Sequence, residues 1–479
     1  MIGVLMPEPH MDDPRELILC DVRCFQDEQR GSLRPITLLV GENSTGKTTF
    51  LGCYSVLHRM LSGSDIDSRL DFNEEPFAMG SFRDIARTRP GPGGHADEFK
   101  LGVTVEPAPD SDAAPYRLFA AFREEGSQPV VSSLRFSFTP DSFLELHWTP
   151  EGITLRIPDH VVETTFPMVD VTFMLEFLMT VGANAERNTG ERPSLQEVAK
   201  LLGPLLGAQR IPHELPQLEP VARYLDGLFP GRDTRRFRLP RLPEPIPVAP
   251  LRSKPRRTYD PIRETASPEG EHVPMLMMRL SRTKRGRWKS LHEDLVAFGR
   301  ESGLFADIKV RGRGAQMSDP FQLQVKVRTG PHANIMDVGY GVSQSLPILV
   351  DVLTAAESGR SRGLRRDTGR TFLLQQPEVH LHPRGQAELA NLFIEAFRKN
   401  GSRFLIETHS DYIVDRVRIS VRKRKLKPDD VSLVYFEPAG NAVTIHNMTL
   451  DENGNLRDAP AGYRDFFVKE TDRVLGFAD

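Results

Sequence analysis

One segment restricts the fold of this chain more than any other, a glycine-rich loop between an expected strand and an expected helix. Its residues are Gly41-Glu-Asn-Ser-Thr-Gly-Lys-Thr-Thr49, which fit the phosphate-binding pattern G-x-x-x-x-G-K-[ST]. The apolar run 36–40 predicts a buried strand that enters the loop, and residues 50–61 predict the helix that leaves it. This order of strand, loop and helix predicts an α/β fold.

The residue types in the loop suit the binding of a nucleotide phosphate. Gly41 and Gly46 let successive backbone N–H groups point at phosphate oxygens, and the helix N-terminus adds partial positive charge. Lys47 is expected to reach the β- and γ-phosphates, and Thr48 is expected to ligate Mg²⁺. The sequence therefore predicts ATP and Mg²⁺ as cofactors. The expected cofactor-binding residues of the loop are Asn43, Ser44, Thr45, Gly46, Lys47, Thr48 and Thr49.

Length and composition limit the class of protein. A chain of 479 residues is too long for one compact core, so we expect more than one domain. The net charge of -3 is not the charge of a globally basic nucleic-acid-binding protein, and the 3 cysteines cannot form a disulfide framework. No run of about 18 apolar residues and no leader segment is evident, which favours a cytoplasmic protein without a membrane partner.

The pattern along the chain predicts four regions. Short alternating runs after the loop predict an antiparallel β region, residues 173–228 have a helical pattern, and residues 231–270 are rich in Pro and Arg, which is typical of a loop. We expect residues 1–160 to form an N-terminal lobe with the loop and the β region, 161–300 a mainly helical insertion and connector, 301–437 a C-terminal lobe, and 438–479 an extension.

Three further segments follow in an order that a nucleotide site requires. Gly339-Tyr-Gly-Val-Ser-Gln344, which we call the signature segment, opens an expected helix. The apolar strand 371–374 leads into Gln375-Gln-Pro-Glu-Val-His-Leu-His-Pro383, and the next strand ends in Thr408-His-Ser410. P-loop ATPases carry acidic groups after such a strand, where one carboxylate holds the Mg²⁺ shell and another orients water.

Together these segments resemble the ABC-type ATPases of the SMC and overcoming-lysogenization-defect (OLD) group, in their prokaryotic AAA branch. The similarity spans roughly residues 15–60 and 250–475 and includes Leu251-Arg-Ser-Lys-Pro-Arg-Arg-Thr-Tyr259. It implies a P-loop ATPase core with a mixed sheet flanked by helices, an antiparallel β subdomain and a helical insertion. It also implies head-to-tail dimers, in which Ser343 contacts in trans the ATP held by the partner's loop, and His409 senses the γ-phosphate.

The chain departs from the family where the acidic pair is expected. Gln375 stands at the position of the Mg²⁺-shell carboxylate, and Gln376 stands at that of the general base. Glutamine can hydrogen-bond water but cannot take its proton. We therefore expect slow hydrolysis. Glu378 is favoured as the source of the missing carboxylate, with Glu407 on the neighbouring strand as the alternative.

The resemblance leads to a first hypothesis about function. OLD-type nucleases carry a C-terminal Toprim domain, and only about 70 residues follow Ser410, so we expect no nuclease chemistry in this chain. Similarity to the ATPase subunits of systems such as PARIS, Septu and Gabija implies an ATP-gated scaffold or sensor in bacterial anti-phage defence. Its expected partners are further copies of the chain and a separate effector, expected to be a nuclease, with DNA or a phage protein as a trigger.

A second hypothesis is an SMC-like ATPase of DNA binding or repair. It rests on two basic clusters, each of which is equally typical of a solvated helix face. No heptad stretch long enough for SMC arms is present. A transporter ATPase is disfavoured, because it would need an intact acidic pair. The clusters consist of Arg279, Arg282, Lys284, Arg285, Arg287 and Lys289, and of Arg416, Arg418, Arg422, Lys423, Arg424, Lys425 and Lys427.

Overall fold

The fold was analysed in a computed structural model. It describes residues 14–61, 70–89, 91, 94–106, 115–139, 141–149, 152–164, 244–260, 265–312, 316, 319–358, 370–463 and 473. Residues 173–228, for which a helical pattern is expected, lie outside the described residues.

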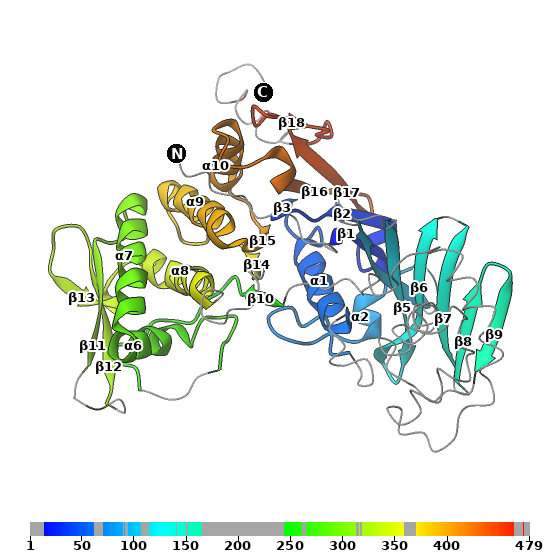
Figure 1. The fold of residues 1–479 in the computed structure, drawn as a ribbon, viewed down its shortest axis with the longest axis horizontal. Helices are drawn as coiled ribbons and strands as arrows, with labels where there is room; N and C mark the ends of the chain where they lie inside the picture. Colours follow the sequence, from blue (N-terminus) through cyan, green and yellow to red (C-terminus); the bar gives the residue numbers. More distant parts are fainter. Residues whose placement is uncertain are drawn as a thin grey trace, which may run out of the picture.

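A mixed sheet of seven strands forms the centre of the fold, in the order β10-β14-β15-β3-β16-β17-β18 (Figure 1). The first five strands run parallel and the last two pair antiparallel. The α/β prediction is confirmed. The strands are β10 (Pro245–Val248), β14 (Thr371–Gln375), β15 (Arg403–Glu407), β3 (Ile36–Gly41), β16 (Val431–Ala439), β17 (Ala442–Leu450) and β18 (Leu456–Arg457).

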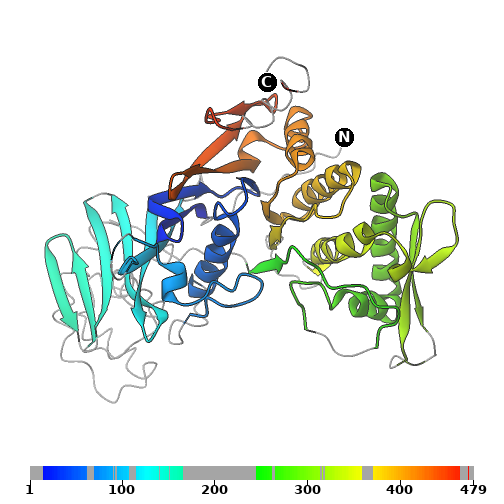
Figure 2. The same ribbon diagram turned by 180° about the vertical axis from the view of Figure 1, so that it is seen from behind.

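A second sheet of eight antiparallel strands lies beside it, in the order β2-β1-β4-β5-β6-β7-β8-β9 (Figures 1 and 2). It confirms the antiparallel region predicted from the alternating runs after the loop. Its strands are β1 (Pro14–Val22), β2 (Phe25–Ser32), β4 (Glu98–Val105), β5 (Tyr116–Glu125), β6 (Gln128–Thr139), β7 (Ser142–Thr149), β8 (Gly152–Ile157) and β9 (His160–Thr164).

Helices cover the central sheet on both sides. Helix α1 (Lys47–Leu61) lies on the side of the antiparallel sheet, near the short α2 (Phe82–Ile85) (Figure 1). The other elements lie on the opposite side. They are α6 (Val273–Thr283), α7 (Arg285–Ser302), α8 (Tyr340–Ser358), α9 (Pro383–Asn400) and α10 (Asp411–Arg422), the 3-10 turns η3 (Ile335–Asp337) and η4 (Pro428–Asp430), and a small sheet of β11 (Asp307–Gly312), β12 (Phe321–Lys326) and β13 (His332–Asn334).

Alternate residues of the central strands enter different hydrophobic cores. Leu39, Leu373 and Leu405 join the core that contains α1 and the antiparallel sheet. Their neighbours Leu38, Leu374 and Ile406 join the core formed with helices α6–α10. Successive side chains of a strand point to opposite faces, so a nearly continuous apolar run is what a sheet covered on both faces requires.

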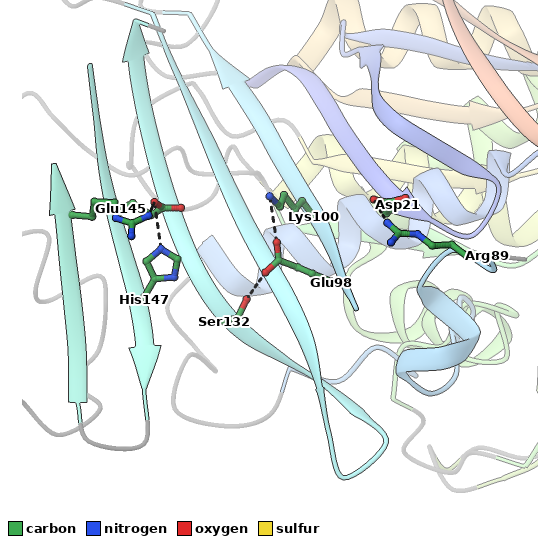
Figure 3. A network of polar contacts seen from close by, with 8 residues as sticks. Asp21, Arg89, Glu98, Lys100, Ser132, Glu145 and His147 are labelled. Atoms are coloured by element: carbon green, nitrogen blue, oxygen red, sulfur yellow. Dashed lines mark hydrogen bonds and ion pairs between the residues drawn. The ribbon is translucent and has the colours of Figure 1, made fainter. Parts of the chain in front are cut away.

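Polar side chains of the antiparallel sheet that point away from the core form hydrogen bonds and ion pairs with each other. The Ser132 hydroxyl donates to Glu98 at 3.2 Å, and Lys100 lies 3.2 Å from the same carboxylate (Figure 3). His147 and Glu145 on β7 lie 3.3 Å apart. These pairs are partly exposed, so they contribute little to stability compared with the buried face of the sheet.

The secondary structure differs from the expectation at two places. Residues 231–270 were expected to be a loop in a separate region, but Pro245–Val248 forms the edge strand β10 of the central sheet. An edge strand tolerates proline because one side of it donates no ladder hydrogen bonds. The boundary at residue 437 falls inside β16, which pairs with β17 as a hairpin, so residues 438–450 belong to the central sheet.

We expect Phe99→Ala to destabilise the N-terminal part of the fold. The Phe99 ring is fully buried and stacks on Phe122 at 5.0 Å, with Phe82 at 5.5 Å and Phe72 at 5.9 Å. Removing it should lower the free energy of unfolding by roughly 3–5 kcal/mol, measured by chemical denaturation followed by circular dichroism. Val161→Ala, at a side chain that is 57% exposed, is the control and should change little. Equal effects of both variants would contradict the packing described.

Candidate functional site

The glycine-rich loop connects β3 to α1. At two positions its backbone has a conformation that favours glycine. Gly41 and Gly46 have φ of +145° and +88°. A Cβ on Gly46 would lie 2.6 Å from the Phe25 ring and 2.7 Å from Cys24 Sγ. Ser44 also has a positive φ, of 63°. Strained backbone of this kind is typical of a loop that aims its N–H groups at a ligand.

Lys47 begins α1 and is only 3% exposed. Its ammonium donates to the Gly41 carbonyl at 3.0 Å and also to the Glu42 carbonyl. Burial lowers the pKa of Lys47, and the nearby Glu407, Glu378 and Glu42 carboxylates partly oppose this effect. The loop therefore holds a desolvated cation close to two carboxylates from other segments.

Thr48 joins the loop to a strand far away in the sequence. Its hydroxyl donates to Glu407 Oε2 at 2.7 Å. Glu407 ends β15, which lies between β3 and β14, and it is 6% exposed. A hydroxyl and a carboxylate oxygen at this separation are the hard oxygen ligands that Mg²⁺ prefers. Glu407, the less favoured alternative in the sequence, thus stands at the expected metal position.

Gln375 ends β14 directly beside Glu407 in the parallel register. The side chain is 5% exposed, and its Nε2 is buried with no hydrogen-bond partner among the described residues. A buried amide without a partner costs free energy, so it fits an oxygen supplied by a phosphate or by a water of the Mg²⁺ shell. The residues around Thr48 therefore fit the expected Mg²⁺–ATP.

Gln376 opens the turn after β14 with a positive φ of 42°. Its N–H donates to the Glu407 carbonyl at 2.9 Å, which fixes the start of the turn to the neighbouring strand. A positive φ at a non-glycine residue is strained, so contacts with the surrounding structure must hold this turn in its conformation. The amide side chain can orient water but cannot act as a base.

Glu378 lies in the same turn and is 8% exposed. One carboxylate oxygen accepts the His409 N–H at 2.7 Å, and Oε2 is buried without a partner among the residues described. Burial raises the pKa of Glu378, against the opposing effects of the His409 N–H and of Arg252. A carboxylate with a raised pKa accepts a proton more readily, so the turn contains a group suited to general-base chemistry.

His409 follows β15 and reaches the same region. Desolvation lowers the pKa of His409, and the Lys47 ammonium lowers it further. The structure thus brings Lys47, Thr48, Gln375, Gln376, Glu378 and His409 into one site at the carboxyl ends of β3, β14 and β15. Ligands of open α/β sheets bind at this edge.

The signature segment opens helix α8, as expected. Helix α8 starts at Tyr340, before Gly341, and Ser343 is 7% exposed with its hydroxyl donating to the Tyr340 carbonyl at 2.9 Å. A Cβ on Gly341 would lie 2.9 Å from the His380 carbonyl, and the Tyr340 and His380 rings are 5.5 Å apart. The segment therefore packs on its own chain's turn after β14, and the role of Ser343 in trans stays a prediction.

Two arginines near the site were not assigned a role from the sequence. Arg23 donates to the Thr49 hydroxyl at 3.0 Å and to the Met79 carbonyl at 2.8 Å, which fixes the start of α1. Arg252, just after β10, is 4% exposed and donates to the Gln376 carbonyl at 3.5 Å. The only available signal for Arg252 was its place in the family-like segment that begins at Leu251.

His382, at the end of the turn after β14, has a structural role. His382 is the N-cap of α9 and accepts the Arg384 N–H at 3.3 Å, followed by Pro383 in the first turn. The part of the chain that the structure describes contains no group of three or more His, Cys, Asp or Glu residues that could hold a metal ion. None of its helices combines the length and the apolar character needed to cross a membrane.

Comparison with known proteins gives one family match. Residues 223–415 match the family described as "AAA domain, putative AbiEii toxin, Type IV TA system". This range contains Arg252, the signature segment, β14 and His409, but not the glycine-rich loop. A search of curated proteins finds no match.

Solved structures of SMC heads resemble the chain distantly. The SMC head bound to the C-winged helix domain of ScpA has 11% identity and a TM-score of 0.40, over 92% of this chain and 98% of that one. The SMC head bound to the C-terminal domain of ScpA, from Pyrococcus furiosus, has 11% identity and a TM-score of 0.42, over 92% and 97%. The SMC head from Thermotoga maritima has 9% identity and a TM-score of 0.36, over 90% and 98%.

We expect Glu407→Gln to weaken the Mg²⁺-dependent part of nucleotide binding. The change removes the charge that accepts the Thr48 hydroxyl but keeps the shape. Affinity for a fluorescent ATP analogue should fall by about tenfold or more in Mg²⁺, and little in EDTA, measured by fluorescence titration. Glu437→Gln on β16, where the carboxylate pairs with His446, is the matched control. Equal losses with and without Mg²⁺ would exclude the metal role.

Proposed function

We propose that the chain is an ATPase that binds Mg²⁺–ATP at the carboxyl edge of its central sheet. The observation that carries this proposal is the hydrogen bond of 2.7 Å from Thr48 to Glu407, which brings together a hydroxyl and a carboxylate oxygen, two ligands of the kind that Mg²⁺ prefers. The buried Lys47 beside them supports phosphate binding. The match to an AAA domain over residues 223–415 supports the same class of activity.

The site residues receive distinct roles in this proposal. Thr48 and Glu407 hold Mg²⁺ and its waters, and Gln375 offers its amide to the metal shell or to a phosphate oxygen. Glu378 takes the proton of the attacking water, while Gln376 orients that water. His409 contacts the γ-phosphate as a neutral imidazole. When bound by Thr48 and Glu407, Mg²⁺ would supply positive charge beside the phosphates.

Slow turnover follows from these roles. Glutamines at 375 and 376 supply no charge next to the metal or to the water, so the base lies two positions further along at Glu378. The Glu378 carboxylate is buried and already accepts the His409 N–H, so it is less mobile and less accessible to water than a carboxylate placed directly after the strand. The ATP-bound state is then long-lived, which suits a protein that assembles around its nucleotide.

We further propose that two copies pair head to tail, with Ser343 of one closing on the ATP of the other. Three large apolar side chains at and near the signature segment support an interface there: Leu251 is 70% exposed, Met336 46% and Tyr340 47%. Exposed apolar residues that gather at one place are typical of a protein interface.

In its cellular role, we propose that the chain is an ATP-gated scaffold or sensor in a bacterial anti-phage defence complex. Long-lived ATP closure would hold or release a separate effector, for which a nuclease is the favoured class. The description of the matched family names a toxin and a TA system, which supports a function shared with a second gene product.

Restoring the acidic pair should speed up hydrolysis. We expect Gln375→Glu with Gln376→Glu to raise kcat by roughly 10²-fold, within the range of general-base effects, in a phosphate-release assay. Lys47→Ala should abolish turnover in both backgrounds. Equal rates for the wild type and the double variant would contradict the impaired site. A wild-type rate equal to that of Lys47→Ala would contradict the ATPase itself.

The scaffold role predicts a nucleotide-dependent complex. The chain, expressed with the products of its neighbouring genes, should retain one of them with ATP and lose or exchange it with ADP, as measured by affinity purification and mass spectrometry. The Lys47→Ala variant should retain the same partners with ATP as with ADP. A chain that remains without partner in both nucleotides would exclude this role.

The alternative function in DNA binding is favoured by one of the two basic clusters. Arg279 on α6, Arg285 on α7 and Lys284 between the two helices are exposed. Lys289 on α7 is also exposed and lies 3.9 Å from Glu293. By contrast, several cations of the α10 cluster are engaged within the fold. Arg416 pairs with Glu388 at 3.8 Å, Arg418 with Asp415 at 2.9 Å, Lys425 with Glu395 at 3.6 Å, and Arg422 donates to the Asn453 carbonyl at 2.9 Å.

If the alternative holds, Lys284→Gln with Arg285→Gln should weaken duplex DNA binding and reduce its salt slope by about two. Filter binding from low to moderate salt measures both quantities. Arg422→Gln with Lys425→Gln is the matched control, because these cations already have partners. Absence of DNA binding by the wild type at low salt would remove this alternative.

A further inference from the structure

Arg252 is a buried cation between the two halves of the candidate site. It lies just after β10 and is 4% exposed. Its guanidinium donates to the Pro250 carbonyl at 3.1 Å and to the Gln376 carbonyl at 3.5 Å. Its Nε is buried with no hydrogen-bond partner among the described residues. The guanidinium thus makes one ordinary hydrogen bond and one long one, and its Nε–H makes none among the described residues.

The main chain of the same residue is fixed to the signature helix. The Arg252 N–H donates to Gln344 Oε1 at 3.3 Å, and Gln344 Nε2 donates back to the Arg252 carbonyl at 3.4 Å. Gln344 is 2% exposed and lies one turn into α8. Arg252 therefore connects α8 to the turn after β14 through a reciprocal pair on one side and its guanidinium on the other.

A buried guanidinium is costly unless an opposite charge is near. Burial lowers the pKa of Arg252 to about 10, and the Glu378 carboxylate opposes that effect. Conversely, burial raises the pKa of Glu378, and the positive charge of Arg252 lowers it. The unpartnered Nε of Arg252 and the unpartnered Oε2 of Glu378 are the two orphan groups of this pair. The cation thus compensates the charge of the carboxylate that the proposed mechanism uses.

We infer that Arg252 is a positioning residue of the hydrolytic site, which holds the Gln376–Glu378 turn in place and ties it to the signature helix through Gln344. This inference rests on the proposed ATPase function. In this role the Arg252 side chain acts through the Gln376 carbonyl and the charge of Glu378. Since α8 begins at the segment proposed to meet the partner's ATP, a shift of α8 on closure reaches Glu378 through Arg252.

Four groups set the charge of Glu378 from the surrounding segments. Arg252 approaches from the connector after β10 and Lys47 from α1, and both favour the ionised carboxylate. The main-chain N–H of His409 and the Thr408 hydroxyl, both following β15, favour it as well. Loss of Arg252 leaves the other three in place, so the pKa of Glu378 rises further. Only the ionised form of Glu378 can act as the base. As the pH falls, a variant without Arg252 should therefore lose activity at a higher pH than the wild type does.

The test compares Arg252→Gln and Arg252→Lys with Arg257→Gln in the full chain. Arg257 lies in the same connector but is exposed and pairs with Asp337 at 2.6 Å, which makes it a matched control. The readouts are the Kd of a fluorescent ATP analogue, kcat, and the pH dependence of kcat. For Arg252→Gln we expect Kd within about twofold of the wild type, kcat lower by roughly tenfold to a hundredfold, and the acid limb moved to higher pH.

Arg252→Lys separates charge from shape, since lysine keeps the positive charge but not the planar fork. We expect it to return the acid limb toward its wild-type position while kcat stays reduced. If Arg252→Gln does not fold, Arg252→Lys and Gln344→Ala, which removes the reciprocal pair, provide the same kcat and Kd comparison.

Three outcomes overturn the inference. They are an unchanged kcat in the Arg252 variants, a loss that is entirely in Kd, and a loss of kcat with the acid limb unmoved in Arg252→Gln. A wild type no faster than Lys47→Ala overturns the proposed ATPase function and with it this role. A wild type that hydrolyses ATP, beside an Arg252→Gln variant of equal rate and profile, overturns the role of Arg252 alone.

Discussion

The hydrogen bond between Thr48 and Glu407 is the contact on which the rest of the site depends. It joins the first turn of α1 to the end of β15, across 359 residues of sequence. The two residues meet because β3 and β15 are adjacent and parallel, so their carboxyl ends share one edge of the sheet. The strand pairing extends to Gln375 on β14, which lies in register beside Glu407. A site of three strands is thereby assembled from the backbone ladder before any ligand arrives.

Charge in this site is balanced by residues from separate segments rather than by a local pair. Lys47 and Arg252 are both almost completely buried, and each lies near Glu378. Lys47 depends on the Gly41 and Glu42 carbonyls of its own loop, whereas Arg252 depends on the Pro250 and Gln376 carbonyls. The nearby Glu378 carboxylate favours the charged form of both cations. The turn itself is strained at Gln376 and held by the Glu407 carbonyl. Electrostatics and backbone geometry therefore stabilise the same few residues.

Much of the fold could be predicted from the sequence, because the patterns that indicate these strands and the loop lie within short segments. The run Ile36–Gly41, the glycines of the loop and the alternating strands after it predicted their elements correctly. β10 was missed because its two prolines argue for a loop unless the strand is known to lie at an edge. Within the site, Glu378 and His409 were predicted, but Glu407 ranked second and Arg252 had no role. The positions of Glu407 and Arg252 beside the loop depend on the order of the strands and on burial, and neither can be deduced from one segment of the sequence.

The place of β10 in the sheet has a kinetic consequence. This strand of four residues pairs with β14 on one side only, which makes it one of the less stable parts of the central sheet. Arg252 follows it by four positions, so detachment of β10 would withdraw the guanidinium from Gln376 and the main-chain partner from Gln344 together. The turn would then be held only by the Gln376 N–H bond to the Glu407 carbonyl and by the His409 N–H bond to Glu378. The opening rate of this one edge strand would therefore set how often the turn loses its connection to α8.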